Sequence, residues 1–194
     1  MLAPRKRLWS TPLSAIDHCL EWIPLKQNDS VLDIGCGDGR ILIEWAERIS
    51  SQKVAFLTSL SFLGIDIDPD RIQESQSAAK AAIATGRLSP EIRMNFVCAN
   101  ALESVELFQN ATVIFLYLIP RGLKQILPLL KDHANRMRAT IRVATYMSKL
   151  PLDDDDGEKM IIKLLGRATC RVEHQREAAW PLYFYEIRPH GAEE

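Results

Sequence analysis

The sequence predicts an α/β fold: a doubly wound, mostly parallel seven-stranded sheet that ends in a C-terminal antiparallel hairpin. Short apolar segments alternate with amphipathic helical segments along most of the chain. The apolar segments are continuous, which is typical of strands buried on both faces, and right-handed crossovers then place helices on both faces of the sheet. The alternation stops after the acidic run Asp153–Asp156, and two strand-like segments follow it. We expect one domain over residues 1–194, with its core at about 9–187.

Capping residues and prolines indicate where the helices begin. Ser10 followed by Pro12 predicts the start of a first helix, whose apolar positions recur at three- and four-residue spacing until Pro24. Apolar residues on one helical face predict a second helix directly after a glycine-rich stretch. Asp68 followed by Pro69 predicts the cap and first turn of a third helix. Two further helices are predicted over 102–108 and 122–130.

Strands are predicted wherever a short apolar or β-branched run stands between helices. Five of these runs make up the alternating part of the chain: 30–34, 61–67, 92–98, 112–118 and 139–145. The terminal hairpin is predicted from residues 170–174 and 182–187. The first two strands are separated by more residues than one crossover helix needs, and the apolar character of residues 52–60 predicts a packed turn or an extended helix there.

Composition excludes several classes of protein. The 194 residues are 47% hydrophobic and 25% charged, which is typical of a globular chain, and the net charge of -1 favours neither nucleic acid nor an anionic membrane as partner. The longest apolar run, Val113–Ile119, is far too short to span a membrane. Four cysteines without CxxC spacing predict reduced thiols and an intracellular protein. We expect the cytoplasm, with the mitochondrion as the alternative because of the basic Arg5–Arg7.

No metal site is predicted. The four histidines share no spacing typical of metal ligands. The acidic run before Gly157 resembles a calcium loop, but placing that glycine at loop position six would put Leu152 at position one and Lys163 at position twelve. Neither residue supplies the carboxylate that the loop requires, so a solvated turn is the better interpretation.

The most informative segment is the glycine-rich stretch 33–40, which lies between the first predicted strand and its helix. Glycines at this place let the backbone turn tightly and approach a ligand. A phosphate-binding P-loop would end in Gly-Lys-Ser/Thr, whereas Gly39 is followed by Arg40. A dinucleotide fingerprint would need a third glycine at position 40, so an NAD-dependent oxidoreductase is also disfavoured.

The spacing of Gly35, Gly37 and Gly39 after Asp33 resembles motif I of the class I, seven-strand S-adenosylmethionine (SAM)-dependent methyltransferases. Segments that agree with this family in order and place are 64–68, 99–102 and the terminal hairpin with 180–185. The resemblance covers about residues 9–187. It implies a Rossmann-like methyltransferase fold, SAM as cofactor and S-adenosylhomocysteine as product.

The resemblance also implies roles for individual residues. Asp66 would accept hydrogen bonds from both ribose hydroxyls, and Ile67 would pack on adenine. Asn100, beside Ala101, would contact the adenine amino group, although family members often carry aspartate there. Asp33 would bind the methionine amino group directly or through water. Thr11, in the segment that leads into the first helix, is expected at the cofactor and the acceptor side of the pocket.

The end of the fourth predicted strand, 116–120, is where this fold places the group that meets the methyl acceptor. It lacks the Asn/Asp-Pro-Pro-aromatic motif of many amino methyltransferases. Together with residues 9–12, it looks like a small group that includes the lysine methyltransferase of the ATP synthase c subunit. That likeness implies a protein lysine as acceptor, with a small molecule or a catalytically inactive binding module as alternatives. Tyr117 would orient the amine, or could equally be a tyrosine packed at a strand end.

Overall fold

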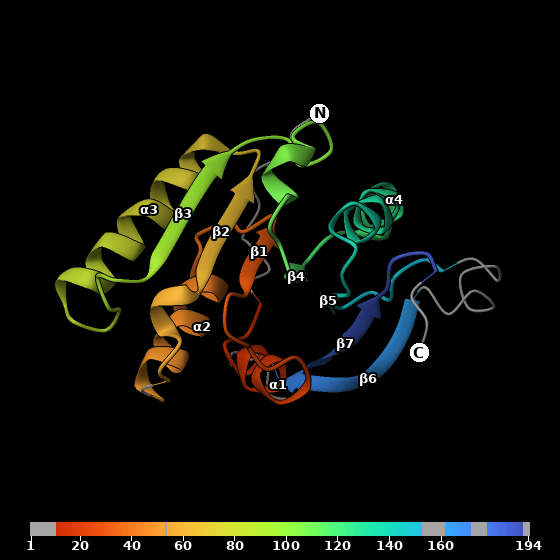
Figure 1. The fold of residues 1–194 in the computed structure, drawn as a ribbon. Coiled ribbons are helices and arrows are strands. Elements are labelled where there is room, and N and C mark those ends of the chain that lie inside the picture. Colours follow the sequence, from red (N-terminus) through yellow and green to blue (C-terminus); the bar gives the residue numbers. More distant parts are fainter. Residues whose placement is uncertain (1–10, 53, 153–161, 172–177, 192–194) are drawn as a thin grey trace.

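The computed structural model describes residues 11–52, 54–152, 162–171 and 178–191. These form a seven-stranded mixed sheet, which confirms the predicted fold class (Figure 1). The strands are β1 Ser30–Ile34, β2 Ser61–Asp66, β3 Arg93–Cys98, β4 Val113–Leu116, β5 Ile141–Tyr146, β6 Ile162–Arg171 and β7 Ala179–Ile187. Their order across the sheet is β3-β2-β1-β4-β5-β7-β6.

The strand order reverses between β1 and β4. From β1 the chain builds outward through β2 to β3, and then it crosses back to add β4 and β5 on the other side of β1. All five strands are parallel, whereas β7 pairs antiparallel with both β5 and β6. Ligands of open α/β sheets bind outside the carboxyl ends of the strands at such a reversal.

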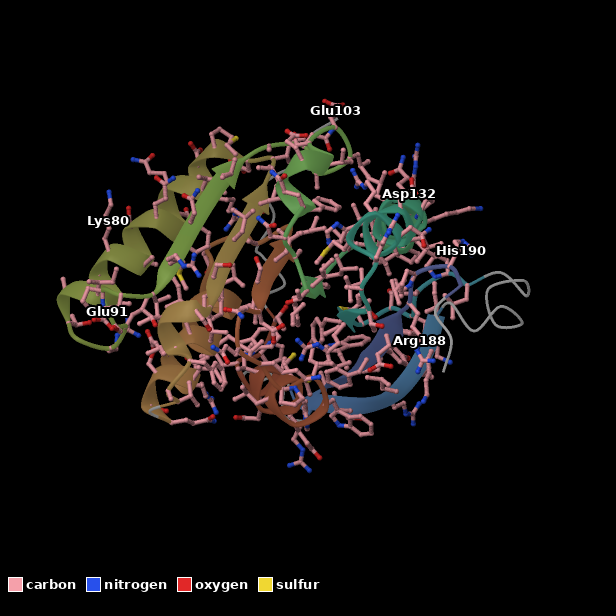
Figure 2. The ribbon with its side chains drawn as sticks, viewed as in Figure 1. Lys80, Glu91, Glu103, Asp132, Arg188 and His190 are labelled. Atoms are coloured by element: carbon pink, nitrogen blue, oxygen red, sulfur yellow. The ribbon has the colours of Figure 1, made fainter. Side chains whose placement is uncertain are left out.

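Helices cover both faces of the sheet. The helices α1 Ser14–Trp22, α2 Arg40–Ser51 and α3 Pro69–Ala84 pack on one face, and α4 Pro120–Met137 packs on the other. The first face buries a cluster that includes Ile16, Trp45 and Phe62, and the second includes Leu32 and Leu127. The labelled charged side chains of Lys80, Glu91, Glu103 and Asp132 are exposed and point outward (Figure 2). Among the described residues, no helix is both long enough and apolar enough to cross a membrane.

Two predicted helices differ from the structure at their ends. α1 begins at Ser14, and its N-cap Leu13 makes no side-chain capping bond; the predicted cap, Ser10, lies outside the described residues. α4 runs from Pro120 to Met137, well beyond the predicted 122–130. Pro120 is at the first helical turn, where its fixed φ suits a helix, and the buried apolar face carries the helix past the internal Pro128.

The predicted helix over 102–108 is wrong. Only a 3-10 turn, η2 Val105–Phe108, occurs there. The side chain of Asn100 accepts a hydrogen bond from the backbone N–H of Leu102, which stabilises a turn in place of a helix. Of the 52–60 segment, residues 54–60 form a packed turn with a 3-10 helix, η1 Leu57–Ser59, and α2 ends before it at Ser51.

The strand predicted over 170–174 is misplaced, because β6 spans Ile162–Arg171 and residues 172–177 lie outside the described part. Pairing with β7 sets the position of β6, and an irregularity between Leu164 and Gly166 weakens its sequence pattern. A Cβ at Gly166 would lie 2.4 Å from the Trp22 ring, so the missing side chain lets α1 pack on this strand.

A buried polar network ties the amino ends of β1, β4 and β5 together. Arg142 Nη2 lies 2.6 Å from Asp29 Oδ2, and both side chains are nearly inaccessible. The Thr112 hydroxyl donates to Asp29 Oδ1 at 2.6 Å, and the Lys26 backbone N–H donates to Asp29 Oδ2 at 2.5 Å. Arg142 also donates to the carbonyl of Pro24. The ion pair between Asp29 and Arg142 therefore lies at the reversal of strand order, and hydrogen bonds satisfy its charged groups.

We expect Arg142→Met to lower the free energy of unfolding by about 3–5 kcal/mol, because it leaves the Asp29 carboxylate buried without its cation. Urea unfolding at neutral pH measures this loss. Arg136→Met, which changes an exposed arginine of α4, is the matched control and should alter stability by less than about 0.5 kcal/mol. Similar losses in the two variants would contradict a special role for the buried pair.

Candidate functional site

A cavity of about 200 Å³ opens at the carboxyl ends of the parallel strands, at the reversal of strand order. Its wall comes from the ends of β1 and β2, the turn after β3 and the start of α4. The lining residues are Ile34, Gly35, Ile65, Asp66, Ile67, Ala99, Asn100, Ala101, Leu102, Leu118, Gly122 and Ile126. Most of this wall is apolar, with one carboxylate and one amide, a composition typical of ligand sites.

The glycines of the loop have different structural roles. Gly35, Gly37 and Gly39 have φ of +83°, +56° and +76°, values that other residues adopt only with strain. A Cβ at Gly37 would meet no atom within 4 Å, so its backbone lies open to an approaching ligand. A Cβ at Gly39 would come within 2.8 Å of the Phe96 ring, so this glycine serves helix–sheet packing.

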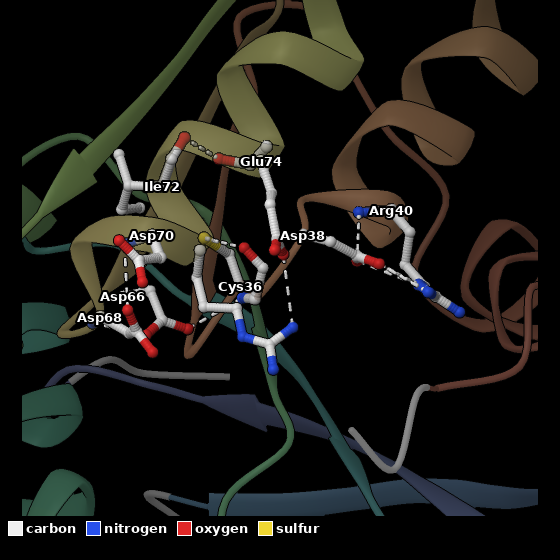
Figure 3. Close-up of polar contacts among 11 residues, drawn as sticks. Cys36, Asp38, Arg40, Asp66, Asp68, Asp70, Ile72 and Glu74 are labelled. Atoms are coloured by element: carbon white, nitrogen blue, oxygen red, sulfur yellow. Dashed lines mark hydrogen bonds and ion pairs between the residues drawn. The ribbon is translucent and has the colours of Figure 1, made fainter. Parts of the chain in front are cut away.

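Asp66, the last residue of β2, is held by two backbone donors (Figure 3). The N–H of Gly37 donates to Oδ2 at 2.9 Å, and the N–H of Asp68 donates to Oδ1 at 3.0 Å. A carboxylate has about four lone-pair sites, so each oxygen keeps one for a ligand hydroxyl. The glycine loop and the end of β2 thus fix one another and aim an acceptor pair at the cavity.

Asp33 is a buried acid in β1, only 3% exposed, beneath the glycine loop. Burial, together with the nearby negative charges of Asp66 and Asp38, raises its pKa to about 8. Asp38 differs: burial alone would raise its pKa, but hydrogen bonds from Arg40 outweigh burial and lower it. No salt bridge to Asp33 occurs in the described part of the chain, so a bound cation would relieve its environment.

Three of the predicted binding residues lie with Asp66 in the cavity wall. Ile67 is 56% exposed although it is apolar, and it forms part of the cavity wall with Asn100 and Ala101. Asp68 caps α3, because its carboxylate accepts a hydrogen bond from the Asp70 backbone N–H at 3.0 Å. This confirms that Asp68 is a capping residue.

Five predicted site residues do not line the cavity: Thr11, Asp33, Gly37, Gly39 and Tyr117. Thr11 is buried but does not contribute to the cavity wall, and Tyr117 lies just past the end of β4 on the other side of the backbone from Leu118. Tyr117 packs edge-to-face against Tyr146, with ring centroids 5.0 Å apart. The strand predicted to reach residue 118 ends at Leu116, so Tyr117 begins the turn into α4.

Seven wall residues were not predicted as site residues from the sequence: Ile34, Ile65, Ala99, Leu102, Leu118, Gly122 and Ile126. A signal existed for one of them, because Gly122 stands in the first turn of a predicted helix, where glycine is unfavourable. A Cβ there would lie 3.4 Å from Leu118, so the glycine keeps this wall close-packed. No cluster of side chains able to hold a metal ion occurs among the described residues.

Comparison with known proteins agrees with this geometry. Residues 25–113 match a family model described as a methyltransferase domain. A protein-lysine N-methyltransferase of Saccharolobus islandicus (strain REY15A) is 30% identical over 121 residues, which span 62% of this chain and 65%, less than two thirds, of the relative.

Solved structures show the same fold. A Salinibacter ruber RNA methyltransferase in complex with S-adenosylhomocysteine superposes with a TM-score of 0.63 at 22% identity, over 95% of this chain and 97% of its own. The magnesium protoporphyrin IX methyltransferase of Synechocystis PCC 6803, also with S-adenosylhomocysteine bound, gives a TM-score of 0.59 at 14% identity, over 91% and 83%.

The residues of the site fit SAM. The carboxylate of Asp66 suits a ribose diol, the exposed Ile67 suits an adenine face, and the buried acid Asp33 suits an ammonium group. The cavity is smaller than the roughly 300–1,000 Å³ typical of ligand pockets, and it has room for part of such a cofactor, with the open backbone of Gly37 beside it. The chain thus has the fold of SAM-dependent methyltransferases, part of it matches a methyltransferase domain, and the residues at its cavity fit SAM as cofactor.

Proposed function

We propose that this protein transfers a methyl group from SAM to the side-chain amine of a protein lysine. The observation that carries the transfer itself is the Gly37–Asp66 hydrogen bond, which joins the glycine loop to the acid at the cavity. The name of the Saccharolobus relative supports lysine as acceptor. The free thiols of all four cysteines support an acceptor inside the cell, in the cytoplasm or the mitochondrion.

Each side chain has a distinct part in holding the cofactor. Asp66 accepts the ribose hydroxyls, Ile67 packs on adenine, and Asn100 with Ala101 closes the adenine end. Asp33 pairs with the methionine ammonium. The open backbone at Gly37 lies along the part of the cofactor between its ribose and its amino-acid end. Thr11 stabilises the segment that leads into α1, because its side chain is buried.

Placement of the acceptor decides the rate. SAM supplies a methyl group on a sulfonium, which departs as a neutral thioether, so the protein needs no nucleophile of its own. A lysine amine has a reference pKa near 10.4, so roughly one molecule in a thousand is neutral near pH 7.4. The protein must therefore select and align the neutral amine, and we assign this role to Tyr117, which directly follows β4.

Two other functions compete with this proposal. A small-molecule amine would use the same cofactor residues and differ only at the acceptor side. A catalytically inactive binding module would have no need for the intact set of Asp33, the loop glycines and Asp66. Labelling of a lysate with isotope-labelled SAM distinguishes these three functions.

We expect the protein to bind S-adenosylhomocysteine and to label lysine residues in a lysate supplied with isotope-labelled SAM. Mass spectrometry of the labelled peptides identifies the modified atom. Label found only in small molecules would favour the small-molecule alternative. Binding without any label in either fraction would favour the inactive module.

Asp66→Ala should weaken S-adenosylhomocysteine binding at least tenfold, because each hydrogen bond to a charged group contributes about 1.5–3 kcal/mol. Calorimetry measures the affinity, and circular dichroism checks folding. Asp68→Ala is the matched control: it removes the α3 cap and costs about 1 kcal/mol of stability, but leaves affinity within twofold. Equal affinity losses in the two variants would show that the loop, and not the Asp66 carboxylate, binds the ligand.

Asp33 should make binding pH-dependent. The raised pKa, about 8, keeps its carboxyl largely protonated at lower pH, whereas an ammonium ligand pairs with the ionised form. Affinity for S-adenosylhomocysteine should therefore rise between pH 6 and 8, by up to about tenfold per unit, with release of a proton on binding. Titrations in buffers of different ionisation enthalpy measure that release.

Asp33→Asn is the companion variant. It should flatten the pH dependence of binding and weaken affinity at pH 8. It should also make the ligand-free protein more stable than the wild type at pH 8, because a carboxyl with a raised folded-state pKa stabilises the fold below its unfolded pKa and loses that contribution as pH rises through about 8. A wild-type pH profile retained in Asp33→Asn would assign the titration to another group.

A further inference from the structure

We propose that Tyr146 is a positioning residue that fixes the ring of Tyr117, and that this aromatic pair selects an alkylammonium side chain as the acceptor. The inference rests on the proposed function and names the residues of its acceptor side. Its starting observation is the edge-to-face contact between the two rings, whose centroids lie 5.0 Å apart at an interplanar angle of 79°. This geometry is one that aromatic pairs prefer.

The pair stands where an acceptor would enter. β4 and β5 are parallel neighbours, and their last register pair is Leu116 with Thr145. The tyrosines follow one residue later on each strand, at the carboxyl edge of the sheet. The next residue, Leu118, lines the cofactor cavity and would lie 3.4 Å from a Cβ at Gly35. Tyr117 is therefore the immediate chain neighbour of a cavity-wall residue.

Tyr146 is the fixed member of the pair. Its side chain is 2% exposed and packs in the core cluster on the α1 face, whereas Tyr117 is half-buried. The chain after Tyr146 is held by hydrogen bonds from the Met147 N–H to the Pro181 carbonyl, at 2.8 Å, and from the Thr145 hydroxyl to the Ser148 carbonyl, at 2.7 Å. Met147 adopts a φ of +69°, which this bonding maintains. Only Tyr117 can reach a ligand, so Tyr146 acts through it.

The chemistry of the pair suits a cation on an alkyl chain. Burial raises the pKa of both phenols, so both rings stay neutral and keep the negative face that attracts ammonium groups. Asp38 and Asp66, acids of the cofactor side whose negative charges raise the pKa of Asp33, disfavour an anionic acceptor. An aliphatic amine offers methylenes to the ring and a charge to its face.

The test uses two nitrogen analogues of SAM in which the methyl group is replaced by a 2-aminoethyl chain or by an isosteric propyl chain. Both carry the same nucleoside and amino acid, so the ratio of their dissociation constants reports the acceptor side alone. We expect wild-type protein to prefer the aminoethyl compound by about three- to tenfold. Tyr117→Leu and Tyr146→Leu should each reduce this preference to nearly one, and the double variant should lose no more than either single variant.

The variants distinguish positioning from general packing. Tyr146→Phe keeps the ring and should keep the preference, and Tyr146→Met replaces Tyr146→Leu if the latter does not fold. Tyr183→Leu is the matched control, because Tyr183 is a tyrosine of β7 that packs in the cluster on the opposite face. It should lose stability and keep the preference.

Three outcomes would overturn the inference. A folded Tyr146→Leu or Tyr146→Met protein with the wild-type preference would show that Tyr146 only fills the core. A wild-type ratio of one would show that the pair does not select a cation. Failure of wild-type protein to bind S-adenosylhomocysteine itself would instead overturn the proposed function, and the inference with it.

Discussion

The ion pair between Asp29 and Arg142 lies under the one place where the strand order reverses. It joins the loop before β1 to β5, and the Thr112 hydroxyl adds the start of β4. Removing two charges from water is costly, and the backbone donors around Asp29 offset that cost. Because strands are stiff over five or six residues, pinning their amino ends also sets where their carboxyl ends meet. The ion pair therefore helps to fix the geometry of the cofactor cavity at the opposite edge of the sheet.

At the carboxyl ends of the strands, the main constraint on the fold is the electrostatic interaction among three acidic side chains. Asp33, Asp38 and Asp66 come from β1, the glycine loop and β2, and each is neutralised differently. Asp38 pairs with Arg40, Asp66 accepts two backbone N–H groups, and Asp33 is left to hold a proton because burial and its acidic neighbours raise its pKa. A group that is unfavourable in the empty fold and favourable beside a cation links stability to ligand binding. A cationic ligand that pairs with Asp33 therefore offsets the unfavourable free energy of burying this carboxyl in the empty fold.

The cofactor half of the site could be predicted from the sequence because its signals are local. The glycine spacing, Asp66 at a strand end and Asp68 before Pro69 each lie within a few consecutive residues, and the turn chemistry that they indicate is present. Predictions failed where tertiary contacts outweigh local pattern. Pairing with β7 moves β6 toward the N-terminus, and the Asn100 turn prevents a helix over 102–108. Thr11 has no local signal beyond its place near a helix start, and it packs inside the fold away from the cavity wall.

The acceptor half depends on contacts that no local pattern contains. Tyr117 and Tyr146 become neighbours only because β4 and β5 are adjacent and in register, and α4 separates them along the chain. Neither tyrosine supplies a hydrogen bond to the glycine loop or to Asp66, so changes at the pair leave the cofactor residues in place. Under the proposed function, such a fold can change its acceptor by substitution at two strand ends while its cofactor residues stay constant. The RNA methyltransferase and the porphyrin methyltransferase with this fold are examples of one architecture that occurs with different acceptors.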